Sequence, residues 1–242
     1  MNCVKFNSLL KALSAILLCE IGGVVVLQNI LTLSKIETIF ILRTVETVLM
    51  ILITIQAKYK EFKDKNPKVK KPEVKLNWFN LYSFTNHSFD HIKKGVKAGF
   101  TWSFYLGIIA VAGGILILLV TQNNPILLFK SPFIEDLRQN GRLELTIFLI
   151  TACIVSPFAE ELFFRGFLYS FFRKYGVFFA LVASTLIFTL CHITSSISKI
   201  PLVPLTGGVI FALSYQYSKS LAAPIIIHIL GNTAIFTLSF LN

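Results

Sequence analysis

Charged side chains are scarce in this chain. Asp, Glu, Lys and Arg together make up 14% of the 242 residues, whereas hydrophobic residues make up 55%. The mean hydropathy is +0.72. A soluble domain of this size cannot bury so much apolar surface. The composition therefore excludes a soluble globular protein and predicts an integral membrane protein.

Paired cysteines and common metal-binding motifs are also missing. The four cysteines lie far apart, without a C-x-x-C pair, at Cys3, Cys19, Cys153 and Cys191. We interpret them as small apolar residues within helices. Cys3 lacks the preceding apolar stretch of a lipoprotein signal, so the first apolar run is predicted to be a retained anchor. The sequence contains no H-E-x-x-H motif of the kind that binds zinc in many proteases.

Long apolar runs fill most of the chain. A membrane-spanning helix needs about 20 mostly apolar residues. The sequence predicts an all-α, polytopic transmembrane bundle of about seven helices, at Ser8–Leu33, Thr38–Ala57, Ala98–Val120, Glu144–Phe171, Val177–Ile197, Leu202–Tyr217 and Leu221–Leu241. The sixth run is short and contains glycine, so counts of six or eight remain open.

Basic residues outnumber acidic ones 23 to 12, and eleven lysines lie in the only long polar segment, Lys58–Lys97. Under the positive-inside rule this loop is cytoplasmic, with the N-terminus inside and the C-terminus outside. The loop could also contact anionic lipid headgroups, and we expect no nucleic-acid binding.

We divide the chain into residues 1–97, with N-terminal helices and the basic loop, and 98–242, the candidate catalytic domain. Residues 121–142 are predicted to lie on the outer interface as an amphipathic piece.

Ionisable residues inside apolar runs need an explanation, because a charge at mid-bilayer costs at least about 2.5 to 3.5 kcal/mol. In the second run Arg43 and Glu46 lie three residues apart and can pair, and Glu20 in the first run is predicted to serve helix packing.

The fourth run holds Glu160, Glu161 and Arg165. Glu161 and Arg165 lie four residues apart, which predicts a compensated ion pair. Glu160 is rotated by about 100° from Glu161 on a helix and cannot share its partner. We therefore expect Glu160 to face a polar cavity or another helix and to act as a general base. A packing network of all three residues remains an alternative.

Two later runs add further polar groups. The fifth run ends in Phe188-x-x-x-His192, and the seventh contains His228-x-x-x-Asn232, whose two side chains project to the same side one turn apart. Three apolar helices thus each contribute polar groups, and we expect them to converge.

In this order the three motifs resemble the signature of the CAAX protease and bacteriocin-processing family, which includes the type II CAAX prenyl endopeptidases. The resemblance covers about residues 144–241 and implies an intramembrane endopeptidase. It implies that Glu160 and His192 activate the attacking water and that His228 and Asn232 stabilise the oxyanion. It also implies that Glu161 and Arg165 hold the site together, and Phe188 is expected to line it. The N-terminal half carries no recognisable motif.

The residues leave the cofactor open. Glu160, His192 and His228 could provide three ligands for zinc, with Glu161 as base, or could work without a metal. The absence of H-E-x-x-H favours the metal-free version. The resemblance implies a membrane-embedded or lipidated peptide as substrate. A catalytically silent bacteriocin-immunity or regulatory protein and a small transporter are the alternatives.

The predicted helix ends place these residues at unequal depths. Glu160 and His228 lie about 10 to 16 Å from the cytoplasmic end, whereas His192 lies about 22 Å deep. We expect the fifth helix to enter the bilayer later, with residues 177–179 at the interface. This places the site in the cytoplasmic half of the bilayer.

Overall fold

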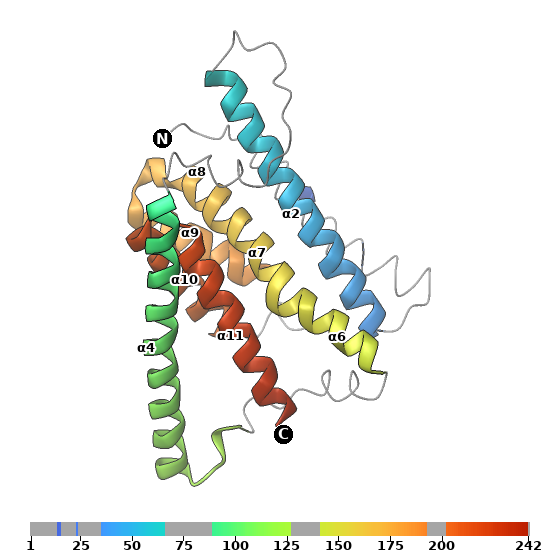
Figure 1. The fold of residues 1–242 in the computed structure, drawn as a ribbon, viewed down its shortest axis with the longest axis vertical. Coiled ribbons are helices and arrows are strands. Elements are labelled where there is room, and N and C mark those ends of the chain that lie inside the picture. Colours follow the sequence, from blue (N-terminus) through green and yellow to red (C-terminus); the bar gives the residue numbers. More distant parts are fainter. Residues whose placement is uncertain are drawn as a thin grey trace.

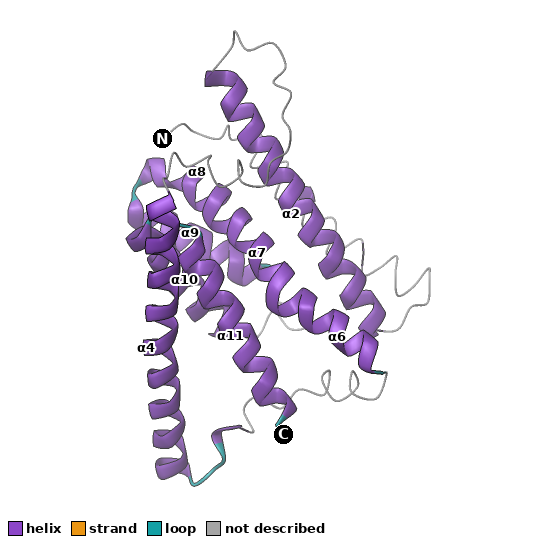
Figure 2. Cartoon of the chain, in the orientation of Figure 1, coloured by secondary structure: helices purple, strands orange, loops and turns teal. Residues whose placement is uncertain are grey.

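The computed structural model describes residues 14–15, 23, 35–65, 89–126, 141–192 and 202–241. Within these ranges every regular element is a helix and no strand occurs, which confirms the all-α prediction (Figures 1 and 2). The separate helices are α2 (Lys35–Lys65), α4 (Phe89–Thr121), α9 (Val177–Leu190), α10 (Leu202–Ser218) and α11 (Ala222–Phe240).

The remaining elements join end to end into one long helix, residues 142–175, which we call the central helix. Its parts are α6 (Arg142–Ile150), a π-helical stretch (Thr151–Val155), α7 (Ser156–Glu161), a second π-helical stretch (Leu162–Tyr169), α8 (Ser170–Phe172) and a final 3-10 turn (Arg173–Tyr175).

These helices agree with the predicted runs from the second to the seventh, apart from the end of the fifth. The first run and the outer piece at 121–142 fall mostly outside the described residues. The side chain of Arg43 also lies outside them, so its pairing with Glu46 stays a prediction. Three described helices are long and apolar enough to cross a membrane: Ile92–Thr121, Arg142–Tyr175 and Ala222–Phe240. The chain is thus an integral membrane protein.

The central helix forms the core of the molecule. α2 packs along one side of it, and α9, α10 and α11 cover the other (Figure 1). Its residues from Ser156 to Tyr169 are almost all buried, and Ala159 and Phe163 are 0% exposed. Phe164 packs edge to face against Phe163 and against Phe188 of α9, with ring centroids 5.1 and 5.0 Å apart. Met50 of α2 belongs to the same hydrophobic cluster, so the N-terminal region shares this core.

The start of α4 packs closely on α11 because two glycines lie one turn apart. A Cβ atom at Gly95 would collide with Ser220, and one at Gly99 would lie 2.9 Å from Ile226 Cβ. Such small residues let two helix backbones approach in a bilayer. Beyond this contact the helices diverge (Figure 1), and a Cβ at Gly107 would meet nothing within 4 Å. Beyond Trp102 and Leu106, which pack against the core, most apolar side chains of α4 are exposed, as for a helix that faces lipid.

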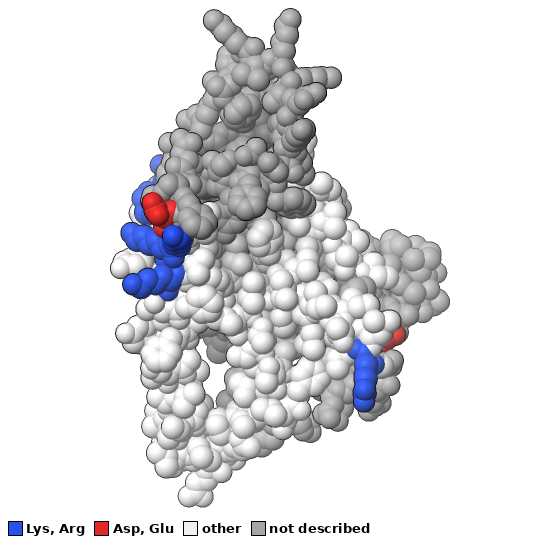
Figure 3. Space-filling view, in the orientation of Figure 1, with Lys and Arg blue, Asp and Glu red and all other residues white. Residues whose placement is uncertain are grey.

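Basic side chains from three parts of the described chain lie at one end of the bundle. Exposed lysines occupy the first turns of α4, at Lys93, Lys94 and Lys97. These turns pack on the segment that follows Lys219, because Gly95 contacts Ser220. Burial, and then the charge of Arg173, lower the pKa of Lys219, which places the Arg173 turn beside it. Figure 3 shows basic side chains gathered at this end and a separate basic side chain beside an acidic one near the start of α6.

Candidate active site

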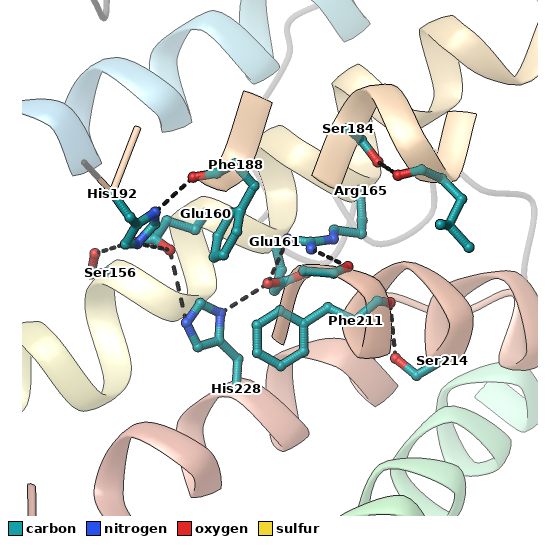
Figure 4. Close-up of polar contacts among 12 residues, drawn as sticks. Ser156, Glu160, Glu161, Arg165, Ser184, Phe188, His192, Phe211, Ser214 and His228 are labelled. Carbon is teal, nitrogen blue, oxygen red and sulfur yellow. Dashed lines mark hydrogen bonds and ion pairs between the residues drawn. The ribbon is translucent and has the colours of Figure 1, made fainter. Parts of the chain in front are cut away.

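Glu160 faces two imidazoles from different helices. It lies near the end of α7 and is buried, at 8% exposure. Its Oε2 is 3.8 Å from Nε2 of His192, which follows α9, and 3.8 Å from Nε2 of His228 in α11 (Figure 4). Its Oε1 accepts a hydrogen bond from Ser156 Oγ at 2.6 Å, one turn earlier. The three motifs read from the sequence therefore meet at this carboxylate.

Glu161 is held by two donors. Arg165 Nη1 donates to Glu161 Oε1 at 3.0 Å, and His228 Nδ1 donates to the same oxygen at 2.9 Å. The predicted ion pair is thus present, and both of its side chains are 0% exposed. Arg165 Nη2 also donates to the Gly208 carbonyl at 2.9 Å, which ties α10 to the site.

Glu160 faces residues of other helices, as expected, whereas Arg165 pairs with Glu161. The expectation that the two glutamates could not share a partner was wrong, since His228 contacts both. Its Nδ1 meets Glu161 and its Nε2 faces Glu160 (Figure 4). The two nitrogens of an imidazole point away from each other. One ring can therefore contact two adjacent helix residues although their side chains leave the helix about 100° apart.

Hydrogen bonds fix the proton on each ring. His192 Nδ1 lies 2.8 Å from the Phe188 carbonyl, which can only accept, so this nitrogen carries the hydrogen. His228 Nδ1 likewise donates to a carboxylate. In the neutral form each Nε2 then directs a lone pair toward Glu160. At 3.8 Å these atoms are beyond direct hydrogen-bond distance and near enough for one water molecule to contact both.

Asn232 contacts the same face of the central helix as His228. Its Nδ2 donates to the Ala152 carbonyl at 2.9 Å. Ala152 lies in the first π-helical stretch, where a carbonyl would pair with the N–H five residues later. That residue is Pro157, which has no N–H to donate. Asn232 therefore satisfies a carbonyl that the proline leaves without its helical partner, and one of its two amide hydrogens remains for another acceptor.

Glu160 of the central helix and His192 after α9 lie level because the central helix is longer than expected. It continues past Phe171 to Tyr175. Fifteen residues then separate Glu160 from Tyr175, and fifteen separate Val177 from His192. Both spans are about 22 Å at 1.5 Å per residue. The depth mismatch seen in the sequence disappears without a later entry of the fifth helix.

Glu160, His192 and His228 are the residues that could bind zinc. Within the described ranges, no three His, Cys, Asp or Glu side chains are arranged so that they could hold a metal ion. The predicted ligands Glu160, His192 and His228 do not form such a group, although Glu160 Oε2 lies 3.8 Å from each imidazole Nε2.

Sequence reasoning overlooked Ser156 and Phe211. Ser156 lies four residues before Glu160, so its hydrogen bond could have been predicted from spacing. Phe211 lies in α10, which carries none of the motifs, and its ring stacks on His228 with centroids 4.4 Å apart. The adjacent Gly207 and Gly208 were the only local signal that α10 approaches the site closely. Phe188 lies against both imidazoles, with centroids 4.5 Å from His192 and 6.0 Å from His228.

Comparisons with known proteins match the part of the chain that contains these residues. Residues 142–234 match the family model for type II CAAX prenyl endopeptidases of the Rce1-like kind. Over 106 residues the chain is 36% identical to the membrane-embedded CAAX protease MroQ of Staphylococcus aureus (strain USA300). The match spans 41% of this chain and 42% of that relative. No solved structure matches the chain. The resemblance predicted from the three motifs is confirmed: residues 142–234, which contain every candidate site residue, are similar to the Rce1-like type II CAAX prenyl endopeptidases.

Proposed function

We propose that this chain is an intramembrane endopeptidase that hydrolyses a peptide bond of a membrane-embedded or lipidated peptide. The observation that carries the proposal is the buried carboxylate of Glu160, which faces Nε2 of His192 and of His228. The similarity of residues 142–234 to type II CAAX prenyl endopeptidases supports the same activity.

Glu160 and His192 activate the water. A water molecule between Glu160 Oε2 and His192 Nε2 contacts two proton acceptors, because the hydrogen of His192 is held on Nδ1 by the Phe188 carbonyl. One acceptor takes a proton from the water as its oxygen attacks the substrate carbonyl carbon. Ser156 supports this step because its hydrogen bond fixes the carboxylate and directs Oε2 toward the imidazoles.

His228 and Asn232 stabilise the oxyanion of the tetrahedral intermediate. The Nδ1 hydrogen of His228 is given to Glu161, so Nε2 donates to an oxyanion only when the ring is an imidazolium. Asn232 supplies its second amide hydrogen. As the intermediate collapses, the leaving amine takes the proton that Glu160 or His192 removed from water.

Arg165 and Glu161 have a supporting role. The guanidinium compensates the Glu161 charge and holds the carboxylate in place, and the carboxylate in turn orients His228. No step of this scheme requires a metal ion. We further propose that the enzyme works in the bacterial cell membrane, with the N-terminus and the Lys58–Lys97 loop in the cytoplasm.

Replacement of Glu160 by glutamine tests the proposal. Glu160→Gln keeps the side-chain size and removes the base, so detergent-purified protein should bind candidate membrane peptides but no longer cleave them. Cleavage is followed by mass spectrometry with and without a chelator, and it should survive the chelator. The matched control is Glu144→Gln, which changes an exposed carboxylate in the first turn of α6 and should leave cleavage unchanged.

Cleavage at the normal rate by Glu160→Gln would contradict the assigned role. If this variant also kept full biological activity in cells, the silent immunity or regulatory function would replace the enzyme. Loss of cleavage on chelation, restored by zinc, would favour the metalloprotease version.

A further inference from the structure

We propose that Phe211 is a positioning residue for His228, acting from a helix that carries none of the sequence motifs. The inference rests on the proposed function, because it explains how the imidazole keeps the orientation that hydrolysis requires. Phe211 is buried, at 8% exposure, and lies in the middle of α10 (Figure 4).

The ring of Phe211 lies face to face with the imidazole. The centroids are 4.4 Å apart and the planes differ by only 21°. Phe188 meets the same imidazole edge-on, at 6.0 Å and 73°. His228 therefore has one stacked neighbour that sets its plane and one edge contact that limits its rotation.

The hydrogen bond to Glu161 alone does not fix this ring. A hydrogen bond at Nδ1 restrains one ring atom, and small combined changes of χ1 and χ2 can still turn the ring while that bond persists. Such a turn would move Nε2 away from Glu160, which it now faces at 3.8 Å. The stack on Phe211 prevents this turn, so the direction of Nε2 depends on Phe211 as well as on Glu161.

Two adjacent glycines make room for the Phe211 ring and for the helix that carries it. A Cβ at Gly207, one turn earlier, would lie 3.3 Å from Phe211 Cε2 and 3.4 Å from Cζ, so the ring covers bare backbone. A Cβ at Gly208 would lie 3.0 Å from Thr185 Cγ2 of α9, so this glycine lets α10 approach. The Gly208 carbonyl binds Arg165, whose Cζ lies 5.1 Å from the Phe211 centroid. Gly208 thus links the surroundings of Phe211 to the series of hydrogen bonds from Arg165 through Glu161 to His228.

The experiment compares four variants of the full-length protein in detergent. Phe211→Leu removes the aromatic face, and Phe211→Tyr keeps it. Gly207→Ala keeps the Phe211 ring but displaces it by a few tenths of an ångström. Phe163→Leu is the matched control, since Phe163 is a buried ring of the same hydrophobic cluster.

We expect Phe211→Leu to lower kcat by about tenfold to a hundredfold with little change in KM, as for a misplaced catalytic group. Gly207→Ala should lower kcat less, and Phe211→Tyr should restore most of it. Phe163→Leu should change the melting temperature more than kcat. A wild-type kcat in Phe211→Leu, or an equal loss of kcat in Phe163→Leu, would overturn the proposal. If Phe211→Leu does not fold, Gly207→Ala takes its place: a lowered kcat supports the proposal, and a wild-type kcat overturns it.

A second readout does not depend on cleavage. In protein labelled with ¹⁵N-histidine, the His228 signal of the wild type should report a hydrogen on Nδ1, and in Phe211→Leu it should move toward a mixture of tautomers. The His192 signal should stay unchanged. An unchanged His228 signal would refute the positioning role even if no substrate were cleaved. Absence of cleavage by the wild type with the expected NMR shift would instead refute the proposed function alone.

Discussion

At the scale of single residues, the buried charge of Arg165 decides whether the site can form. Its guanidinium is 0% exposed and binds Glu161 Oε1 and the Gly208 carbonyl. Its Cζ also lies 4.8 Å from the Phe188 centroid. One cation therefore links the central helix to α10 and contacts α9. Losing it leaves the buried carboxylate of Glu161 without its compensating charge, with His228 as its hydrogen-bond partner.

We expect Arg165→Ala to lower both the amount of folded protein and its activity. Removing one partner of a buried ion pair costs about 3 to 5 kcal/mol, because the other charge remains desolvated. Membrane abundance and the melting temperature in detergent measure this effect. Arg142→Ala, at the exposed start of α6, is the control and should behave as wild type. Normal abundance, melting and cleavage in Arg165→Ala would mean that the ion pair does not support the site.

At the scale of elements, two irregularities in the helices set the geometry. The π-helical stretches on both sides of α7 change the direction of the side chains that follow, and they flank the segment that carries Glu160 and Glu161. The close contact of α4 with the start of α11 supports the helix that bears His228. Helix packing in the membrane, rather than the motifs alone, thus positions the site.

Gly99→Ala should destabilise the protein by about 1 to 3 kcal/mol, the usual cost of overpacking. The added Cβ would lie 3.1 Å from the Ala223 carbonyl and 2.9 Å from Ile226 Cβ, and backbone cannot easily move away. Gly107→Ala in the same helix is the matched control, as its Cβ would meet nothing within 4 Å. Melting in detergent should fall for the first variant and stay equal or rise for the second. The same melting temperature for both would show that α4 and α11 do not touch at this point.

At the scale of the whole molecule, the charges indicate how the bundle lies in the membrane. The basic side chains at the start of α4, at the Arg173 turn and at Lys219 belong to one end (Figure 3). The positive-inside rule assigns such an end to the cytoplasm. The three parts come from distant points in the sequence, and their common position is what the predicted alternation of helices requires.

Reporter fusions test this orientation. A reporter inserted after Lys70 should be cytoplasmic, and one at the C-terminus should be external, because five predicted spans, an odd number, lie between these two points. Alkaline phosphatase, active outside, and a fluorescent protein, active inside, give complementary signals. Reversed signals at both points would turn the whole bundle over and move the site toward the other face of the membrane.

The sequence by itself determined the class of the protein, most helix positions, the Glu161–Arg165 pair and the identity of the converging residues. Each of these depends on local properties: apolar run length, and the fixed angle between residues three or four apart on a helix. The apolar run predicts a helix end at Phe171, before the turn at Arg173 and Lys174, yet the helix continues to Tyr175. Local patterns locate helix ends poorly when a charged turn extends a buried helix.

The tertiary structure alone decided how the side chains meet. That His228 contacts both Glu160 and Glu161, that Asn232 binds the Ala152 carbonyl, and that Phe211 stacks on the imidazole all depend on separate helices. The distances between such helices are set by packing, including the close approach at Gly208 and the π-helical geometry before Pro157. Spacing along one helix carries no information about the rotation of another, which is why only the folded bundle fixes the direction of each nitrogen.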